Sequence, residues 1–562
     1  MIAAVPPYVV VAAPAARVTC AGDTVTRIEV RSHPPSSRSA AEHAVAATSE
    51  AVSSRPNATR ESVILAYVRL RAGEPCTEAA RRESERLLRA QRFIASAAVT
   101  AFTDGPLRVR IRVDVVEELP WVIGGSVRDG GIDRLQLGTR NFDGRGLTLI
   151  GTAELGGPFR PGAGLVAVQH GVMGRPAYAA LEVRRRPLGG LLSASIAEPF
   201  LTDRQRYALH ASFAQETSYP TLVRPVADDG AVRLRRSAYD VGWIRRVGSF
   251  REGGIVGLAG AVLIGTDVRT AGEVVIVTDS GLVSTTDTVL AGRYENFGAG
   301  RIAGMGGIRA LRYKTVARFD ALRAAQDIGT GFQASLLMGP SLWNSRSVRD
   351  VLVAGDIYAA VGGVTSLAAL HLKAEGRRAQ DGVEWDAIVG SGRLSWHRVT
   401  SERRTRILSV SAATVSRLVF PVQLTFRDPD GGLAGFAGSH EAGGRRAVFR
   451  AEQRSLLPWF RTRADFAVAA FADVGRLWAG DVPYGETSPV RSSVGISLVG
   501  AYPSNGKRQY RLDLAVPVNP ESGGGGLAIR FSSADRTGSV WLEPLDVARA
   551  RSATGAAALL RW

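Results

Sequence analysis

From about residue 134 onward, the chain consists of short segments in which apolar and polar side chains alternate. In one such segment, Leu512, Leu514 and Val516 fall on one face, and Arg511 and Asp513 fall on the other. Because successive side chains of a β-strand point to opposite faces, this period predicts strands with one apolar and one charged face. The charged face excludes the dry core of a sandwich, and we expect the apolar face to meet lipid.

A sheet of this kind is stable in a membrane when it closes into a barrel, because closure leaves no edge of unpaired backbone groups. We count about fifteen to nineteen candidate strands, separated by Gly, Pro, Asp and Asn. No apolar run is long enough for a transmembrane helix. The sequence therefore predicts a mainly β fold with a C-terminal, antiparallel transmembrane β-barrel.

A different pattern precedes the barrel. Residues 24–31 alternate as a half-buried strand, helical periodicity begins after Asn57, and Thr77 is placed to cap a second helix. Two more alternating segments, 95–102 and 107–117, predict a hairpin. The order β-α-α-β-β predicts one small α+β domain.

These patterns divide the chain into four parts. Residues 1–19 have the character of an atypical or truncated secretory signal, because they begin with an uncharged stretch but lack a basic leader. Residues 20–119 are assigned to the α+β domain and 120–531 to the barrel. The remaining 532–562 are a C-terminal extension, in which 547–561 has the composition of an Ala/Arg-rich helix.

The net charge of +18 comes almost entirely from arginine, which is spread along the whole chain. A basic protein of this size is a candidate for binding nucleic acid. No helix-turn-helix, zinc-finger or RNA-binding signature accompanies the charge, so no nucleic-acid partner is expected. Within a barrel, arginines suit the lumen or a rim that faces anionic lipid.

Cys20 and Cys76 are the only cysteines. In an exported chain they permit one disulfide, and two unpaired thiols remain the alternative. None of the 7 histidines has metal-ligand spacing with them, so no metal site is expected. The chain also lacks Gly-X-Ser-X-Gly, His-Glu-X-X-His and P-loop motifs, so neither an enzyme nor a cofactor is expected.

One glycine-rich loop and two acidic strands stand out in the last fifth of the chain. The loop motif consists of Gly432, Leu433, Ala434, Gly435 and Phe436. Glu452 and Asp473 follow it on the next two predicted strands, in the phrases Phe-Arg-Ala-Glu and Phe-Ala-Asp-Val-Gly. In that order, and with an earlier Asn-Phe-Asp-Gly-Arg-Gly phrase at 141–146, the chain resembles the BamA/TamA-type outer-membrane superfamily, also known as the bacterial surface antigen family.

The resemblance implies a barrel of 16 strands in which the loop follows the eleventh strand, folds back into the lumen and leaves five strands behind it. The chain has candidates for those five at 447–454, 464–475, 492–500, 508–518 and 526–531. The family's loop carries an arginine that pairs with acidic groups on the next two strands.

Here the arginine position is occupied by Ala434, while the acidic positions are Glu452 and Asp473. We hypothesise that the loop still folds inward, held by Gly435 and Phe436 and by one flanking arginine. The arginines that flank the loop and could substitute are Arg427, Arg445 and Arg446, while Arg450 and Arg454 lie close to the acidic positions in sequence. The alternative is that the two carboxylates are ordinary lumen charges.

The N-terminal domain also resembles a known module. Its element order and the phrase Gly-Glu-Pro-Cys-Thr at 73–77 are similar to those of a POTRA domain. The resemblance implies a periplasmic module that captures extended polypeptide by strand addition, with 95–102 as the first candidate for the exposed edge. The alternative is a plain α+β spacer.

The closing strand is expected to contain Gly526, Ile529 and Phe531, which resemble the C-terminal signal of outer-membrane barrels. We expect it to pair with the first strand, at about 134–142. In relatives this seam opens and templates an incoming strand. A run of four glycines, 523–526, leads into the closing strand and either weakens it or forms a turn.

The resemblance therefore implies an outer-membrane protein that assembles, inserts or translocates other proteins by strand templating at the seam. The expected partners are the outer-membrane lipid bilayer and unfolded or extended polypeptide clients, with the N-terminal domain in the periplasm. Two alternatives remain open. One is a pore that conducts polypeptide or solutes, and the other is a structural surface antigen.

Overall fold

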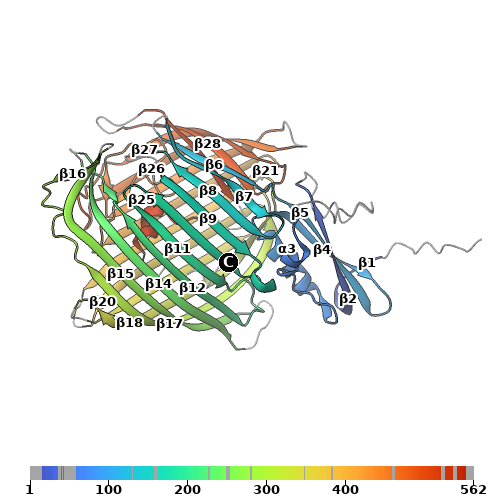
Figure 1. The fold of residues 1–562 in the computed structure, drawn as a ribbon. Coiled ribbons are helices and arrows are strands. Elements are labelled where there is room, and N and C mark those ends of the chain that lie inside the picture. Colours follow the sequence, from blue (N-terminus) through green and yellow to red (C-terminus); the bar gives the residue numbers. More distant parts are fainter. Residues whose placement is uncertain are drawn as a thin grey trace, which may run out of the picture.

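The computed structural model shows a small N-terminal α+β domain attached to one end of a large β-barrel (Figure 1). It describes residues 16–35, 40, 42, 58–128, 131–156, 162–225, 228–248, 254–278, 281–346, 349–380, 382, 384–458, 463–520, 526–535 and 541–551. The segment 1–15, in which a signal was expected, lies outside the described residues, as do Gly523 to Gly525.

The N-terminal domain is a five-stranded sheet in the order β1-β4-β5-β2-β3. Its strands are β1 (Arg17–Val18), β2 (Ala21–His33), β3 (Pro75–Thr77), β4 (Ile94–Thr103) and β5 (Arg108–Glu117). Two described helices, α2 (Glu61–Leu65) and α3 (Glu78–Arg89), lie between β2 and β4 in the chain. The predicted β-α-α-β-β order is therefore present, with β1 and β3 as short additional strands.

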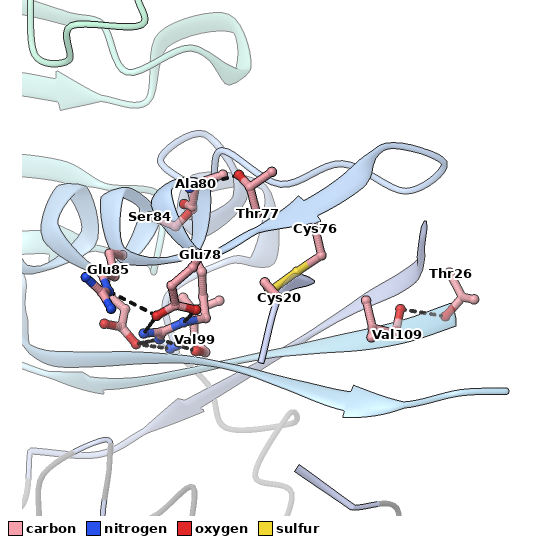
Figure 2. Close-up of a disulfide and its surroundings, with 12 residues drawn as sticks. Cys20, Thr26, Cys76, Thr77, Glu78, Ala80, Ser84, Glu85, Val99 and Val109 are labelled. Carbon is pink, nitrogen blue, oxygen red and sulfur yellow. Dashed lines mark hydrogen bonds and ion pairs between the residues drawn. A yellow bond between two sulfur atoms is a disulfide. The ribbon is translucent and has the colours of Figure 1, made fainter. Parts of the chain in front are cut away.

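Helix α3 begins where the sequence places its cap. The side chain of Thr77 accepts a hydrogen bond from the backbone N–H of Ala80, with a nitrogen–oxygen distance of 3.3 Å (Figure 2). This bond satisfies one of the free N–H groups of the first helical turn. Leu87 and Leu88, on the inner face of α3, are fully buried in one apolar cluster with Ile111 and Val113 of β5. Capping and an apolar face together explain the helix.

Cys20 and Cys76 form a disulfide (Figure 2). Cys20 directly precedes β2, and Cys76 is the central residue of β3, so the bond fastens the short edge strand β3 to its neighbour. The sequence separation is 56 residues. A cross-link of this span stabilises a fold mainly by restricting the unfolded chain.

We expect the double variant Cys20→Ser/Cys76→Ser to lower the free energy of unfolding of the N-terminal domain by about 2–4 kcal/mol, because the unfolded chain regains loop entropy. Pulse proteolysis of the full-length chain at increasing urea measures this as earlier cleavage within residues 20–117. Cleavage of the barrel serves as the internal control. An unchanged urea dependence in the domain would contradict a stabilising role for the bond.

The barrel is closed and, in the part of the chain that the structure describes, contains 22 strand segments. Two of them, β13 (Thr221–Leu222) and β16 (Gly281–Thr285), only extend the hairpins of β14 and β15, so 20 strands complete the circuit. These 20 are β6 (Trp121–Arg128), β7 (Gly131–Phe142), β8 (Leu147–Glu154), β9 (Gly162–His170), β10 (Tyr178–Arg186), β11 (Gly189–Glu198), β12 (Tyr207–Ser218), β14 (Gly230–Val247), β15 (Val256–Thr278), β17 (Phe297–Val316), β18 (Gln326–Asn344), β19 (Asp350–Gly362), β20 (Ser366–Ala379), β21 (Trp385–Ser401), β22 (Arg404–Ser416), β25 (Arg445–Leu456), β26 (Asp465–Trp478), β27 (Arg491–Ala501), β28 (Arg508–Pro517) and β29 (Ala528–Asp535).

The prediction of about 16 strands is wrong. The five strands predicted after the loop are present as β25 to β29, so the four additional strands precede the loop. The number 16 came from the resemblance, and alternation along one strand does not specify how many neighbours complete the ring. Glycines within the long strands β15 and β17 serve close packing. At Gly265 and Gly300 a Cβ atom would lie 2.1 Å from the ring of Tyr239 and 2.3 Å from the ring of Trp343, respectively.

The barrel closes between β29 and β6. The prediction that the segment 134–142 forms the closing partner is therefore wrong, because that segment belongs to β7, the second strand. Gly526 precedes β29, whereas Ile529 and Phe531 lie within it. The last strand also continues to Asp535, so the extension begins later than the predicted residue 532.

The two faces of the barrel wall have opposite character, as the alternation predicts. On β28, Leu512 and Val516 are exposed on the outer face, whereas Asp513 and Ala515 are buried on the inner face. Many other large apolar side chains are exposed on the barrel strands. They include Ile123, Leu137, Leu165, Leu181, Leu192, Leu209, Val241, Leu263, Ile302, Leu336, Ile357, Leu372, Leu394, Val410, Val468 and Ile496. An apolar outer surface around a polar interior is what a barrel in lipid requires.

The N-terminal domain contacts one end of the barrel at three places: strand β18, the β7–β8 turn and the connection before β28. Arg89 of α3 forms an ion pair with Asp327 of β18, with nitrogen–oxygen distances of 2.8 and 2.9 Å. The Asn-Phe-Asp-Gly-Arg-Gly phrase forms the β7–β8 turn, where Asn141 donates to Thr59 at 2.7 Å and Gly144 accepts from the Arg60 backbone at 2.8 Å. Lys507, before β28, donates to the carbonyl of Ile94 at 3.0 Å. We call this the domain end of the barrel.

Candidate functional site

The connection 417–444, between β22 and β25, folds into the barrel interior. Its base is pinned by two short strands, β23 (Leu424–Thr425) and β24 (Ala442–Gly443), which pair with each other. The motif residues Leu433 and Phe436 are 4% and 3% exposed and pack in one apolar cluster with wall residues of β22, β25 and β26. The loop is therefore an internal element of the barrel.

Glycines of the loop and wall provide the close approaches that this packing needs. At Gly432 a Cβ atom would lie 2.0 Å from the carbonyl oxygen of Phe426, so only glycine fits this turn. Gly435 has φ +88° and lies against the backbone of Val516 and Pro517 at the end of β28. The loop tip thus reaches the strand next to the closing strand.

Asp473 is fully buried on β26 and is the carboxylate that meets the loop. Its Oδ2 accepts the backbone N–H of Ala434 at 3.2 Å. Arg450, on the neighbouring strand β25, binds the same carboxylate through Nε at 2.6 Å and through a terminal nitrogen at 2.8 Å. A wall arginine therefore supplies the positive charge that Ala434 lacks, and the loop contributes a backbone hydrogen bond.

Glu452 has a different role from the one predicted. It lies on β25, where one carboxylate oxygen binds Arg454 at 2.8 Å and the other binds Arg511 of β28 at 2.8 Å. Arg511 continues the chain of ion pairs to Asp513, at 2.6 Å. The structure thus assigns Glu452 to a charge network along the wall and Asp473 to the contact with the loop.

Two of the flanking arginines hold the base of the loop. Arg446, 3% exposed, donates to the carbonyl oxygen of Thr425 at 2.5 Å. Arg427 donates to the Ser439 carbonyl within the loop and forms an ion pair with Asp229, which precedes β14, at 3.0 Å. These two arginines bind the base of the loop, whereas the arginine that pairs with Asp473 is Arg450.

Sequence reasoning missed the bond between the loop and the seam. Arg530 of the closing strand β29 lies opposite Asp513 in register and donates to the carbonyl oxygen of Pro429 in the loop at 2.5 Å. Ile529 and Phe531 have the opposite orientation, since they lie opposite the outward-facing residues Leu514 and Leu512. An arginine between two apolar residues on the last strand was the available signal.

The interior keeps an open volume beside the loop. A cavity of about 1150 Å³ is bounded by the loop, by β29 and by wall strands on the other side of the seam. Its lining includes Leu433 and Ala434 from the loop, and Gln136 and Arg184 from the wall. Leu545 and Asp546, beyond the last strand, also line it, so the C-terminal extension enters the barrel.

Comparison with known proteins yields structural neighbours only. No protein-family model matches the chain, and no curated protein matches it. The chain is similar to the solved structure of BamA from Haemophilus ducreyi lacking POTRA domains 1–3, at 12% identity and a TM-score of 0.40, over 91% of this chain and 84% of that one.

CdiB structures match over the same share of the chain. CdiB from Escherichia coli has 10% identity and a TM-score of 0.47, covering 91% of this chain and 77% of that one. CdiB from Acinetobacter baumannii has 10% identity and a TM-score of 0.41, covering 91% and 74%. These TM-scores are too low to carry an argument about activity, which has to come from the loop and the seam.

We expect Asp473→Asn to lower the free energy of unfolding of the barrel by about 3 kcal/mol, because it leaves Arg450 without its buried counter-charge. Ala434→Arg should change it by less than about 1 kcal/mol, since Arg450 already occupies the carboxylate. Urea unfolding of the folded protein in lipid vesicles, followed by tryptophan fluorescence, measures both. A strong stabilisation by Ala434→Arg would show that Arg450 does not replace the missing loop arginine.

Proposed function

We propose that this chain is an outer-membrane insertion or translocation factor of the BamA/TamA type, which acts on unfolded or extended polypeptides. The observation that carries the proposal is the seating of the Gly432–Phe436 loop inside the barrel, against Asp473, with five strands left before closure. The loop is bonded to the wall at Asp473 and to the closing strand at Arg530. A movement of the loop in the lumen would therefore act on the strand that closes the barrel.

The lengths and composition of the seam strands support lateral opening. β6 and β29 have 8 residues each, whereas β15 has 23. β6 also contains Gly124 and Gly125, and glycine weakens a strand. A short and glycine-containing pair costs less to separate than a pair of long strands, and the freed edge can pair with an incoming strand. In this proposal the client is templated between β6 and β29.

The N-terminal domain is proposed to act as a POTRA-like module in the periplasm. The edge predicted at 95–102 is β4, but it is partly covered. β1 pairs with Ala101 and Phe102. At Val99, side chains of helix α3 bind the backbone groups that a neighbouring strand would otherwise bind. Glu85 accepts the Val99 N–H at 2.9 Å, and Arg81 donates to the Val99 carbonyl at 2.8 Å (Figure 2). We call the ion pair of Arg81 and Glu85 the clasp. Strand addition at β4 requires the clasp to release the backbone of Val99.

A second candidate function is a conduit for polypeptide or solute. The 20-strand ring and the internal cavity of about 1150 Å³ favour it, because a wider barrel encloses more space. The two functions differ in whether the seam has to open.

We expect a disulfide across the seam to abolish insertion. An ideal Cβ on Gly124 lies 3.0 Å from the Oγ of Ser533, so Gly124→Cys/Ser533→Cys places two thiols within reach. In the Cys20→Ser/Cys76→Ser background, the purified protein in liposomes should accelerate the folding of an unrelated, urea-unfolded barrel. Oxidation should remove this acceleration, and reductant should restore it.

The matched control is Ala214→Cys/Ala238→Cys, which joins β12 and β14 at facing positions away from the seam. Its oxidation should leave the folding rate unchanged. If the oxidised seam variant still accelerates folding, strand templating at the seam is wrong. If neither protein accelerates folding but both conduct ions, the conduit is the better assignment.

Opening the clasp on β4 should increase client capture. We expect Arg81→Ala/Glu85→Ala to raise severalfold the yield of photo-cross-links from a reactive residue at Thr100 to an unfolded barrel client. The control is Arg82→Ala, which removes an exposed arginine of the same helix that pairs with Glu78. Equal yields in both variants would mean that clients do not bind along β4.

A further inference from the structure

The described part of the C-terminal extension, Trp541–Arg551, lies inside the barrel and ends in the short helix α4 (Leu545–Ala550) (Figure 1). β29 ends at Asp535, opposite Arg508, which is the domain end of the barrel. The wall partners of the segment extend from His371 in the middle of β20 to Arg446 near the far end of β25. The described segment therefore runs through the lumen from the middle of the barrel toward the end that is far from the N-terminal domain.

An ion pair and a cap hold the start of α4. Asp546 binds Arg446 with nitrogen–oxygen distances of 2.6 and 3.1 Å, and the Arg446 side chain is 2% exposed. The backbone N–H of Asp546 donates to Asp428 in the lumen loop at 3.1 Å. Because Arg446 also binds the base of the loop, the same arginine joins the loop and the extension.

The end of the segment is held by a second polar cluster. Arg551 binds Glu543 at 2.6 and 2.8 Å and Ser391 of β21 at 2.9 Å. Lys373 of β20 lies 4.0 Å from Glu543. From another part of the wall, Arg236 of β14 donates to the backbone carbonyls of residues 549 and 551. The segment is thus bonded to wall strands on separate arcs of the ring.

Apolar packing complements these bonds. Val547 and Ala550 are 0% and 2% exposed and share one cluster with Leu433 and Phe436 of the loop motif. Trp541 packs edge-on against His371, with ring centroids 4.7 Å apart. Pro544 fits where the loop has no side chain, since a Cβ on Gly431 would lie 2.6 Å from its Cγ. The extension and the loop therefore pack closely, with the Pro544 ring in the space beside Gly431.

We infer that Trp541–Arg551 is a plug, a resident occupant of a lumen site that the wall and the loop build for a polypeptide segment with an aromatic residue and charges of both signs. The site presents Arg446 to Asp546, and Arg236 to the backbone carbonyls of residues 549 and 551. Lys373 and Ser391 lie beside the Glu543–Arg551 pair. An extended segment of the same chemistry competes for the site, so displacement of the plug opens the lumen and frees the loop. This inference rests on the proposed membrane location and not on insertion at the seam.

The test is the conductance of planar lipid bilayers that contain the purified protein. The full chain should conduct weakly. A chain that ends at residue 540 should conduct on the order of tenfold more, because a hydrated passage replaces the packed segment. A synthetic peptide of residues 541–551 should close this chain in a dose-dependent way. The same peptide with lysine at positions 543 and 546 should not.

Charge exchange tests the plug without shortening the chain. Arg446→Glu and Asp546→Arg should each raise the conductance, and the double variant should lower it again, since the ion pair is restored with reversed polarity. Arg549→Ala, which removes an exposed side chain of α4, is the control and should behave as the full chain.

Three results would overturn the plug. The first is that the shortened chain conducts no more than the full chain, although its gel mobility before heating shows a folded barrel. The second is that the peptide does not lower the conductance of the shortened chain. The third is that the charge-exchange variants all conduct equally. The folding assay with the seam disulfide is independent of these. If the folding assay shows no role for the seam but the plug controls conductance, the protein is a gated conduit. If the seam is required for client folding but the plug does not affect conductance, the protein is an insertion factor and the segment has a structural role.

Discussion

The whole structure depends on how a closed barrel pairs the charges that it turns inward. A wall that exposes leucine, isoleucine and valine outside has to place its arginines and carboxylates inside, where an unpaired ion is costly. The barrel meets this requirement with ion pairs within and between strands. Arg450 of β25 pairs with Asp473 of β26. Glu452 of β25 binds both Arg454 of the same strand and Arg511 of β28. The arginine bias of the chain is thereby used in the wall, where one guanidinium can bridge two strands.

The same pairing rule explains how the interior is filled. A ring of 20 strands encloses more space than its wall side chains occupy, so segments from outside the wall have to complete the packing. The loop 417–444 and the segment Trp541–Arg551 do this together, around the shared residues Asp428 and Arg446. Because the loop also binds Arg530 of the closing strand, a change in the lumen can reach the seam through one side chain.

The alanine in the loop motif shows how a charge can be relocated without losing the contact. Asp473 keeps a guanidinium partner, but this partner comes from the adjacent strand, and the loop retains only the Ala434 N–H. The loop is therefore held by apolar burial and by bonds at its base more than by its tip. A loop of this kind can leave Asp473 without exposing an unpaired carboxylate, since Arg450 stays behind.

Local patterns in the sequence determined the strands, their inner and outer faces, the α+β order of the N-terminal domain and the five strands after the loop. These depend on the period of side-chain alternation and on caps such as Thr77, which act over a few residues. The pairing of Cys20 with Cys76, the number of strands, the closure of β29 on β6 and the partner of Asp473 were decided only by the tertiary structure. Each joins residues far apart in the chain or depends on the full circuit of the ring, and alternation along one strand does not specify its neighbour. The plug is the extreme case, because its fit exists only once the loop and the wall have formed the site.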